Sequence, residues 1–357
     1  MIRIYVRRSR DVEYLATDRA GELDELRDGP PGRWWRGRGD PHDPRDAARV
    51  LTSTDRAGVV GYDVVIAAPR PISILLAVDR ASGADVVAAH QRAARAAVEY
   101  LDDHALVVRR QRAGERREEG AHWSDIVSYT HGVNRHGEPH LHDHVLVGAR
   151  PRGESVVLDS RSLFAHAVAA DALYRTSLRH EVAVATSWTP WRSFGGVEHV
   201  IDLDEGYRAL WGGHHHDRGA KLHWSSEDAR RAWRADLVRF TAHGAVPAPS
   251  PVRRFDEHAY AAAFEGRASV TRRDVVTAWS DAAVFGQDAV ALSRSVDLLY
   301  PALRDSRGLQ ATGIGVADAR LTGVVRDHGP RPVEFDDLAQ WRYRSRERSR
   351  DGVERSR

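Results

Sequence analysis

The chain of 357 residues contains no cysteine. It therefore has no disulfide framework, no thiolate zinc site and no thiol nucleophile, and this composition fits a reducing compartment. No apolar run approaches the roughly 18 residues that a membrane span needs. Arginines interrupt the N-terminal stretch MIRIYVRRSRDVEYL, which excludes the apolar core of a secretory signal. We therefore expect a cytoplasmic protein without membrane insertion.

Lysine is almost absent as well. Lys221 is the only lysine among 53 basic residues, and with 51 acidic residues the net charge is +2. Residues 341–357 alone carry seven arginines and three acids, a net of +4, so the remainder is slightly acidic. A nucleic-acid surface would therefore have to be a local face of the molecule. The P-loop pattern G-x-x-x-x-G-K-[ST] does not occur, so we expect no nucleotide-driven helicase in this chain.

Hydrophobic residues (42%) and charged residues (29%) occur in globular proportions, and the length suits two domains or one large domain with an appendage. The stretch 29–41 reads as a Pro/Gly loop with two tryptophans. Alternation and β-branched runs predict strands at 1–6, 61–69, 105–112, 122–131 and 140–150, and a strand pair at 188–203. Helical spacing predicts helices at 10–21, 84–105, 163–184, 225–240, 271–283 and 291–305.

The most informative segment is rich in histidine. His140, His142 and His144 alternate along one predicted strand, so they project from one face. If that strand forms a hairpin with the preceding one, centred between residues 136 and 137, His131 lies directly opposite His142. Opposed Cβ atoms lie about 4.5–5.5 Å apart, which brings the imidazoles of His131, His142 and His144 onto one metal ion.

Three imidazoles without a thiolate leave coordination positions open, which is typical of a catalytic metal site rather than a structural one. A solvated histidine-rich strand is the simpler interpretation, but the third histidine at hairpin spacing weighs against it. The run His214–His216 lies among glycines, and we interpret it as a solvated loop.

Four segments then match one family in order. His131 is followed after ten residues by Leu-His-x-His, with Pro139 three residues before His142. The stretch 61–73 is similar to a Tyr-Asp-x-x-x-Ser-Ala-Pro-Lys-Ser-x-Ser strand, with Ala67 and Arg70 replacing serine and lysine. Residues 30–39 resemble a Trp-x-Gly-x-Gly segment, and 156–182 a following strand and helix. Over about residues 1–240 the chain resembles the relaxase domain of TrwC/TraI-type (MobF) conjugative DNA-strand transferases, within the HUH endonuclease superfamily.

The resemblance implies an α+β fold: an antiparallel sheet of about five strands, the metal site on one face and helices on the other. We expect a relaxase domain over 1–245, a small helical region over 246–335 and a basic, disordered tail over 336–357. The implied activity is site- and strand-specific DNA nicking and strand transfer at an origin of transfer. It implies Mg²⁺ or Mn²⁺ as cofactor, although three imidazoles alone suit Zn²⁺ or Ni²⁺ equally. Implied partners are single-stranded DNA with its origin hairpin, a separate helicase, and a coupling or secretion apparatus.

The family cuts DNA with a tyrosine near its N-terminus. Tyr14, at the start of a predicted helix, matches the family position, whereas Tyr5 reads as a sheet residue. Attack by Tyr14 would give a 5′-phosphotyrosine and a free 3′-hydroxyl. Asp63 matches the family acid that orients a metal-binding histidine. The stretch 22–27, where many members have a second tyrosine pair, contains no tyrosine, which puts a two-tyrosine scheme in doubt.

Four residues are candidates for DNA contact. Trp34 and Trp35 stand between arginines, and we expect one of them to stack on a base and the other to pack in the core. Arg70 and Arg135 match basic family positions near the scissile phosphate. The arginines of 109–117 alternate with glutamates, and we interpret that stretch as a solvated hairpin tip.

Three other functions remain open at this point. A rolling-circle replication initiator of the same superfamily usually has its metal motif before the tyrosine, whereas Tyr14 precedes His131 here. A small-molecule metalloenzyme of cupin type would need a glutamate ligand and a repeating Gly-rich pattern, which the sequence lacks. A degenerate relaxase that binds DNA without cutting is favoured by the substitutions at Ala67, Arg70 and Pro71 and by the missing tyrosine pair.

Overall fold

A computed structural model describes most of the first 305 residues. Arg135, the stretch 22–27, the run 214–216 and the basic tail lie outside the described residues, and the proposed domain limits at 245 and 335 stay a prediction. The described residues are 1–16, 32–51, 58–78, 83–112, 114–134, 136–151, 155–186, 191–194, 197–200, 203–204, 206–211, 226–240, 243, 255–265, 267 and 269–305.

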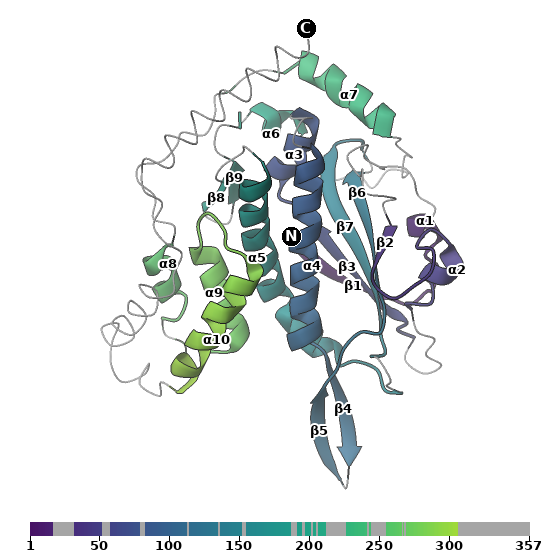
Figure 1. Cartoon of the computed structure of the whole chain (residues 1–357), viewed down its shortest axis with the longest axis vertical. Helices are drawn as coiled ribbons and strands as arrows, with labels where there is room; N and C mark the ends of the chain where they lie inside the picture. The colour runs from purple at the N-terminus through teal and green to yellow at the C-terminus, as the bar shows by residue number, and fades with distance from the viewer. Residues whose placement is uncertain are drawn as a thin grey trace.

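The centre of the molecule is an antiparallel sheet of five strands, in the order β1-β3-β7-β6-β2 (Figure 1). This confirms the expected α+β fold. Strands β6 and β7 form a hairpin that places the histidine motif in the middle of the sheet, with β3 on its other side. The strands are β1 (Ile2–Arg7), β2 (Gly32–Arg36), β3 (Gly61–Ala67), β6 (Ile126–Val133) and β7 (Pro139–Gly148).

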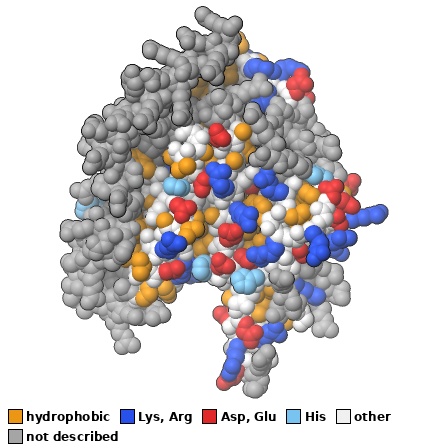
Figure 2. All heavy atoms as spheres, in the orientation of Figure 1, with side chains coloured by type: hydrophobic (Ala, Val, Ile, Leu, Met, Phe, Trp, Pro, Cys, Tyr) orange, Lys and Arg blue, Asp and Glu red, His pale blue; other side chains and the backbone are white. Residues whose placement is uncertain are grey.

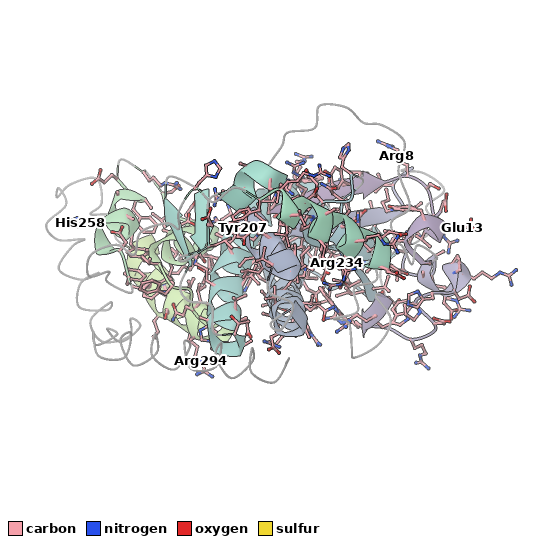
Figure 3. All side chains as sticks on the ribbon, turned by 90° about the horizontal axis from the view of Figure 1, so that it is seen from above. Arg8, Glu13, Tyr207, Arg234, His258 and Arg294 are labelled. Atoms are coloured by element: carbon pink, nitrogen blue, oxygen red, sulfur yellow. The ribbon has the colours of Figure 1, made fainter. Side chains whose placement is uncertain are left out.

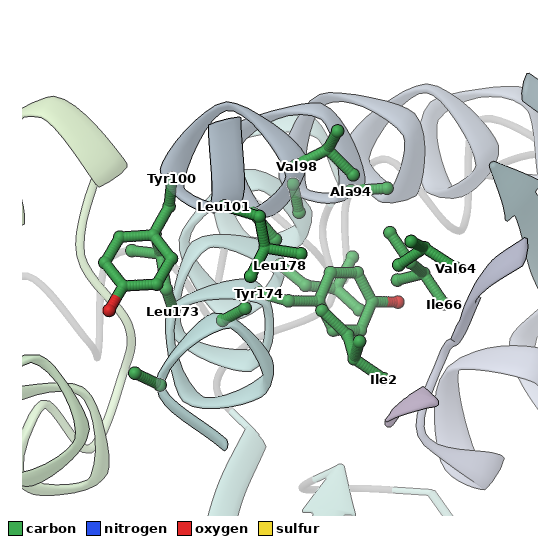
Figure 4. Close-up of a cluster of buried hydrophobic side chains, with 14 of the residues drawn as sticks. Ile2, Val64, Ile66, Ala94, Val98, Tyr100, Leu101, Leu173, Tyr174 and Leu178 are labelled. Atoms are coloured by element: carbon green, nitrogen blue, oxygen red, sulfur yellow. The ribbon is translucent and has the colours of Figure 1, made fainter. Parts of the chain in front are cut away.

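The two long helices α4 (Gly83–His104) and α5 (Ser160–Ala185) pack side by side against one face of the sheet (Figure 1). Alternate residues of β3 and β7 supply the sheet side of this core, including Val64, Ile66 and Val145, and aromatic side chains of the helices fill it (Figure 4). Helix α3 (Arg70–Val78) joins the same core. The long helices therefore cover one face, as expected from the sequence.

A smaller apolar cluster lies on the opposite face. From the strands, side chains project toward Leu15 and Leu51; these are Leu146, Val127 and Tyr129. Leu15 lies in the short helix α1 (Glu13–Ala16), and Leu51 follows the short helix α2 (Pro44–Ala47). Because Leu146 shares its strand face with His142 and His144, this second cluster packs beside the histidines and fixes the position of α1, which carries Tyr14.

The expectation of a loop over 29–41 is wrong for residues 32–36, which form edge strand β2. Trp34 lies opposite Val127 of β6, and consecutive large aromatic side chains suit a pleated surface with packing on both sides. The turn signals apply only to the residues that follow: Gly37 and Gly39 have φ angles of 118° and 121° and end the strand. The sequence does not predict helix α3, because Pro69 and Pro71 indicate a break in regular structure where its apolar residues begin.

The charged hairpin β4 (Val107–Arg112) and β5 (Glu115–Gly120) projects from the end of α4 (Figure 1). Its charges pair across the strands, with Arg109–Glu118 at 2.9 Å and Arg110–Glu119 at 3.1 Å. Basic and acidic side chains are also intermixed over the helical face of the molecule (Figure 2). The hairpin therefore fits the expected solvated tip rather than a basic patch.

The C-terminal helices are α8 (Glu257–Ala262), α9 (Arg272–Ala282) and α10 (Ala289–Asp305), of which α9 and α10 pack on α5. Buried Arg179 donates to the carbonyl oxygens of Ser280 and Ala283 at 2.9 and 3.2 Å, at the end of α9. Viewed from above, Arg8 and Glu13 lie at one end of the molecule and His258 of α8 at the other (Figure 3). The remaining elements are β8 (Trp191–Phe194), β9 (Val197–Val200), α6 (Gly206–Trp211) and α7 (Ser226–Val238). None of the helices in the described part of the chain is both long and apolar enough to cross a membrane.

Candidate metal and nucleophile site

The three histidines of the motif meet on the sheet face opposite α4 and α5. His131 lies directly opposite His142 across the β6–β7 hairpin, as the sequence predicts. His131, His142 and His144 each offer a ring nitrogen, and these atoms all lie within 4.8 Å of one another. His140 shares the strand face and its ring packs against His142 in a tilted arrangement, with ring centroids 4.7 Å apart, but it is not part of this group.

Hydrogen bonds leave the second nitrogen of two histidines available for an ion. His144 Nδ1 donates to the Asp63 carboxylate, 3.0 and 3.1 Å from its two oxygens. His142 Nδ1 donates to the carbonyl oxygen of His140 at 2.8 Å. Each contact fixes the hydrogen on Nδ1 and leaves Nε2 as the nitrogen that can bind an ion, which is the arrangement of metal-binding histidines.

The protonation state of the site also suits a cation. Burial lowers the pKa of His142 well below its ordinary value of 6.5, and the neighbouring rings of His140 and His131 lower it further. Neutral imidazoles are the form that binds metal ions. The donor set therefore fits a divalent ion, and Asp63, which is 5% exposed, lies where the sequence predicts an orienting acid.

Tyr14 is connected to this group through Arg7, a residue that no sequence motif identifies. Arg7 on β1 donates to the Tyr14 hydroxyl at 2.8 Å. The same Arg7 nitrogen lies 3.9 Å from Asp63 Oδ2, which in turn contacts His144. Arg7 faces the histidine side because it shares a strand face with Arg3 and Tyr5 along β1, and this parity is the signal that could have identified it.

The environment of Tyr14 keeps its hydroxyl protonated. Burial raises the pKa of Tyr14 above its ordinary value of 10.0, and the Asp63 carboxylate adds to this, while Arg7 acts in the opposite direction. The tyrosine is 42% exposed, so its ring remains open to a large substrate. A protonated phenol is a weak nucleophile, and such a group needs help to release its proton.

Tyr5 is the other exposed tyrosine on this face. It lies directly opposite Asp63 in the β1–β3 pair and is 49% exposed. Its place in a regular strand agrees with the expectation that it is a sheet residue. Its proximity to Asp63 nevertheless makes it the natural comparison in any test of Tyr14.

The expected DNA-contacting residues differ in their surroundings. Trp34 packs against the apolar cluster beside the histidines, and its Nε1 donates to the Gly39 carbonyl at 2.9 Å. Trp35 packs against the large core on the other face. Arg70 begins α3 and lies 3.3 Å from the Pro139 carbonyl oxygen and 3.6 Å from Glu138, at the start of the histidine strand. Both tryptophans are half-buried, and Arg70 contacts the residues at the start of the histidine strand.

A second group of possible ligands, formed by Asp102, Asp103 and His122, has a structural explanation. Asp102 is 3% exposed, pairs with Arg36 at 2.9 Å and accepts from the backbone N–H of Trp123 at 2.8 Å. These contacts tie the edge strand β2 to the end of α4, and we assign no metal to this group.

Comparison with solved structures shows a related fold. The metal-bound structure of conjugative relaxase TrwC in complex with oriT DNA is 18% identical to the chain, with a TM-score of 0.53, covering 68% of this chain and 99% of that one. TrwC complexed with a 27-mer DNA, comprising the recognition hairpin and the cleavage site, is 18% identical, with a TM-score of 0.51 and coverage of 67% and 98%. A copper-bound TrwC–oriT complex has 19% identity and a TM-score of 0.51, with the same coverage.

Comparison at the sequence level gives the family. The chain has no match among curated proteins. The profile of the TrwC relaxase family matches residues 32–211, about half of the 357 residues. This segment includes β3 with Asp63, the β6–β7 hairpin with its three histidines, and the long helix α5. On this match and the shared fold, the chain belongs to the TrwC relaxase family.

Proposed function

We propose that the chain nicks single-stranded DNA at an origin of transfer, in a site- and strand-specific manner, with Tyr14 as the nucleophile. The observation that carries this proposal is the connection of the Tyr14 hydroxyl, through Arg7 and Asp63, to His144 of the histidine group. Family membership and the origin DNA held by the similar TrwC structures support the substrate.

The reaction exchanges one phosphodiester bond for another. The Tyr14 oxygen attacks the scissile phosphorus, an O–P bond forms, and the bond from phosphorus to the 3′ oxygen breaks. The phenol releases its proton to solvent, and the 3′ oxygen takes up a proton as it leaves. The products are a 5′-phosphotyrosine and a free 3′-hydroxyl. Because the energy of the broken phosphodiester bond is kept in the new one, religation needs no ATP.

The residues around Tyr14 have separate tasks in this scheme. Arg7 donates a hydrogen bond to the phenolic oxygen, which stabilises the phenolate as the proton leaves. Asp63 holds the His144 ring through Nδ1. His131, His142 and His144 hold a divalent cation, which when bound polarises the scissile phosphate and orients it for in-line attack. We propose Mg²⁺ or Mn²⁺ for this role, with Zn²⁺ or Ni²⁺ compatible with the donor set.

DNA binding is assigned to residues around the same face. Arg70 lies at the start of the histidine strand and would contact a phosphate beside the scissile one. Trp34 lies on the histidine face and is the better placed of the two tryptophans for base stacking, with Trp35 as the packing residue. Arg135 completes the proposed set. A separate helicase and a coupling or secretion apparatus are the proposed protein partners.

The test is formation of a covalent adduct. The full chain is incubated with labelled single-stranded DNA from its own origin and Mn²⁺, and the products are separated under denaturing conditions. We expect a labelled protein band with wild type and with Tyr5→Phe, and none with Tyr14→Phe, which keeps the ring but loses the oxygen. If only Tyr5→Phe abolishes the band, the nucleophile is Tyr5. If wild type binds the DNA but forms no band, the chain is a relaxase relative that binds without cutting.

A further inference from the structure

A buried carboxylate lies directly behind the histidine group. Asp143 stands between His142 and His144 in β7, so its side chain projects from the opposite face of the sheet, into the core with α4 and α5. It is 0% exposed. Its oxygens lie 3.2 Å from His90 Nε2 on α4 and 3.3 Å from the Ser128 hydroxyl on β6. Nothing in the proposed reaction uses this residue.

His90 links Asp143 to the second long helix. Its Nδ1 lies 2.8 Å from the Tyr174 hydroxyl on α5, and His90 is itself 0% exposed. An imidazole with its hydrogen on Nε2 suits both contacts, because its Nε2–H lies beside the Asp143 carboxylate and its Nδ1 accepts from the Tyr174 hydroxyl. Burial raises the pKa of Tyr174 well above 10.0, so its hydroxyl keeps the proton that it donates. Figure 4 shows the Tyr174 hydroxyl directed toward the sheet.

The same network reaches the strand that carries the third histidine. The Thr130 side chain hydrogen-bonds Asp143, its cross-strand neighbour, and its hydroxyl accepts from Gln91 Nε2 of α4 at 2.9 Å. Thr130 immediately precedes His131. Each histidine of the group is therefore the chain neighbour of a side chain in this network. We call the set His90, Gln91, Ser128, Thr130, Asp143 and Tyr174 the Asp143 network.

A buried carboxylate is costly unless its partners are well placed, and an apolar side chain could fill the same space. Here the partners come from α4, α5 and β6, so the network fixes β7 and β6 relative to both long helices at the level of the three histidines. A metal site needs its ligands held within a few tenths of an ångström, and groups behind the ligands supply that precision.

We propose that the Asp143 network is a positioning device for the histidine group, which sets its geometry and hence its affinity for a divalent ion. The inference rests on the proposed metal site. Its residues are positioning residues, since none of them reaches the sheet face where the ion and DNA would bind. It predicts that breaking the network weakens metal binding in protein that remains folded.

The test compares Mn²⁺ affinity with stability in four full-length proteins. The metal-free proteins are titrated with Mn²⁺ alone by calorimetry, and their melting temperatures are measured without metal. His90→Leu removes both polar contacts, whereas His90→Gln retains a donor and an acceptor. Val98→Ala, in a fully buried position two turns along α4, is the matched control for lost stability.

The expected result is a Kd for Mn²⁺ about tenfold higher in His90→Leu, with most of the affinity restored in His90→Gln. Val98→Ala should melt at a lower temperature and keep the wild-type Kd. A wild-type Kd in His90→Leu would overturn the inference, and so would a Kd in Val98→Ala raised as much as in His90→Leu. If His90→Leu does not fold, Thr130→Val gives the same comparison with a milder change. No Mn²⁺ binding by wild type would instead contradict the metal site itself.

Discussion

Arg7 joins the Tyr14 hydroxyl to Asp63 and thereby to the histidine group. The sequence predicts Tyr14, Asp63 and the three histidines, because their spacing matches a motif and because strand alternation places the histidines on one face. It does not predict Arg7, since one arginine among the 52 of the chain carries no signal until the register of β1 against β3 is known. Residue spacing does not predict which residues of two strands distant in sequence contact each other.

Removing the Arg7 guanidinium should slow adduct formation. Arg7→Gln takes a positive charge away from the Tyr14 oxygen, so the pKa of Tyr14 rises further and less phenolate forms. We expect adduct formation at least tenfold slower at neutral pH, since charge-assisted hydrogen bonds contribute about 1.5–3 kcal/mol. Single-turnover kinetics on labelled origin DNA measure this. Arg8→Gln, at the exposed neighbouring position, is the control and should react like wild type.

The pKa of Tyr14 also predicts a pH profile. Because this pKa lies above 10.0, the phenolate fraction increases about tenfold for each unit of pH below it. The rate of adduct formation should therefore rise from pH 6 to pH 9 in wild type, and the Arg7→Gln profile should be displaced to higher pH. A rate that is independent of pH over this range would show that release of the phenolic proton does not limit the reaction.

Among the elements, the histidine hairpin was predictable and the edge strand β2 was not. The hairpin register follows from where β6 and β7 turn, and His131 lies opposite His142 as expected. In β2 the flanking prolines and glycines hide a strand of five residues, whose pairing with β6 is a tertiary effect. Likewise, no pattern in the local sequence predicts that α9 packs on α5, because that contact depends on Arg179 and on the close approach of the backbone at Gly286.

Gly286 shows how tightly the C-terminal helices pack. Its φ is +83°, and an added Cβ would lie 2.5 Å from both the backbone nitrogen of His180 and the carbonyl oxygen of Thr176. We expect Gly286→Ala to lower the free energy of unfolding by about 2 kcal/mol or more, from backbone strain and a clash with α5. Chemical denaturation measures the loss.

The control for that substitution is Gly114→Ala. Gly114 also has a positive φ, of +85°, but nothing lies within 4 Å of the added Cβ. Gly114→Ala should therefore lower the free energy of unfolding only by the conformational penalty of the positive φ, about 1 kcal/mol. Equal losses in the two variants would mean that the contact between Gly286 and α5 contributes nothing to stability.

At the scale of the whole molecule, the sheet separates two environments. One face carries the core and the Asp143 network, and the other carries Tyr14, Arg7 and the histidines beside a small apolar cluster. The strands are thus the rigid support of the proposed site. A ligand bound on one face should therefore raise the stability of the entire fold.

Metal binding should accordingly stabilise the whole protein. At a Mn²⁺ concentration of 100 times Kd, binding to the native state alone adds about 2.7 kcal/mol to the free energy of unfolding. We expect a higher melting temperature with Mn²⁺ in wild type, and no such shift when His131, His142 or His144 is changed to alanine. His140→Ala, outside the group, should retain it. A shift that persists in His131→Ala would exclude the three-histidine site.

The most direct measurement is the identity of the residue that carries the DNA. The adduct of wild type with origin DNA is trimmed by nuclease and protease, and the nucleotide-bearing peptide is located by mass spectrometry. We predict a phosphodiester-linked nucleotide on Tyr14, attached through its 5′ phosphate. A nucleotide on Tyr5 or on any other residue would contradict it.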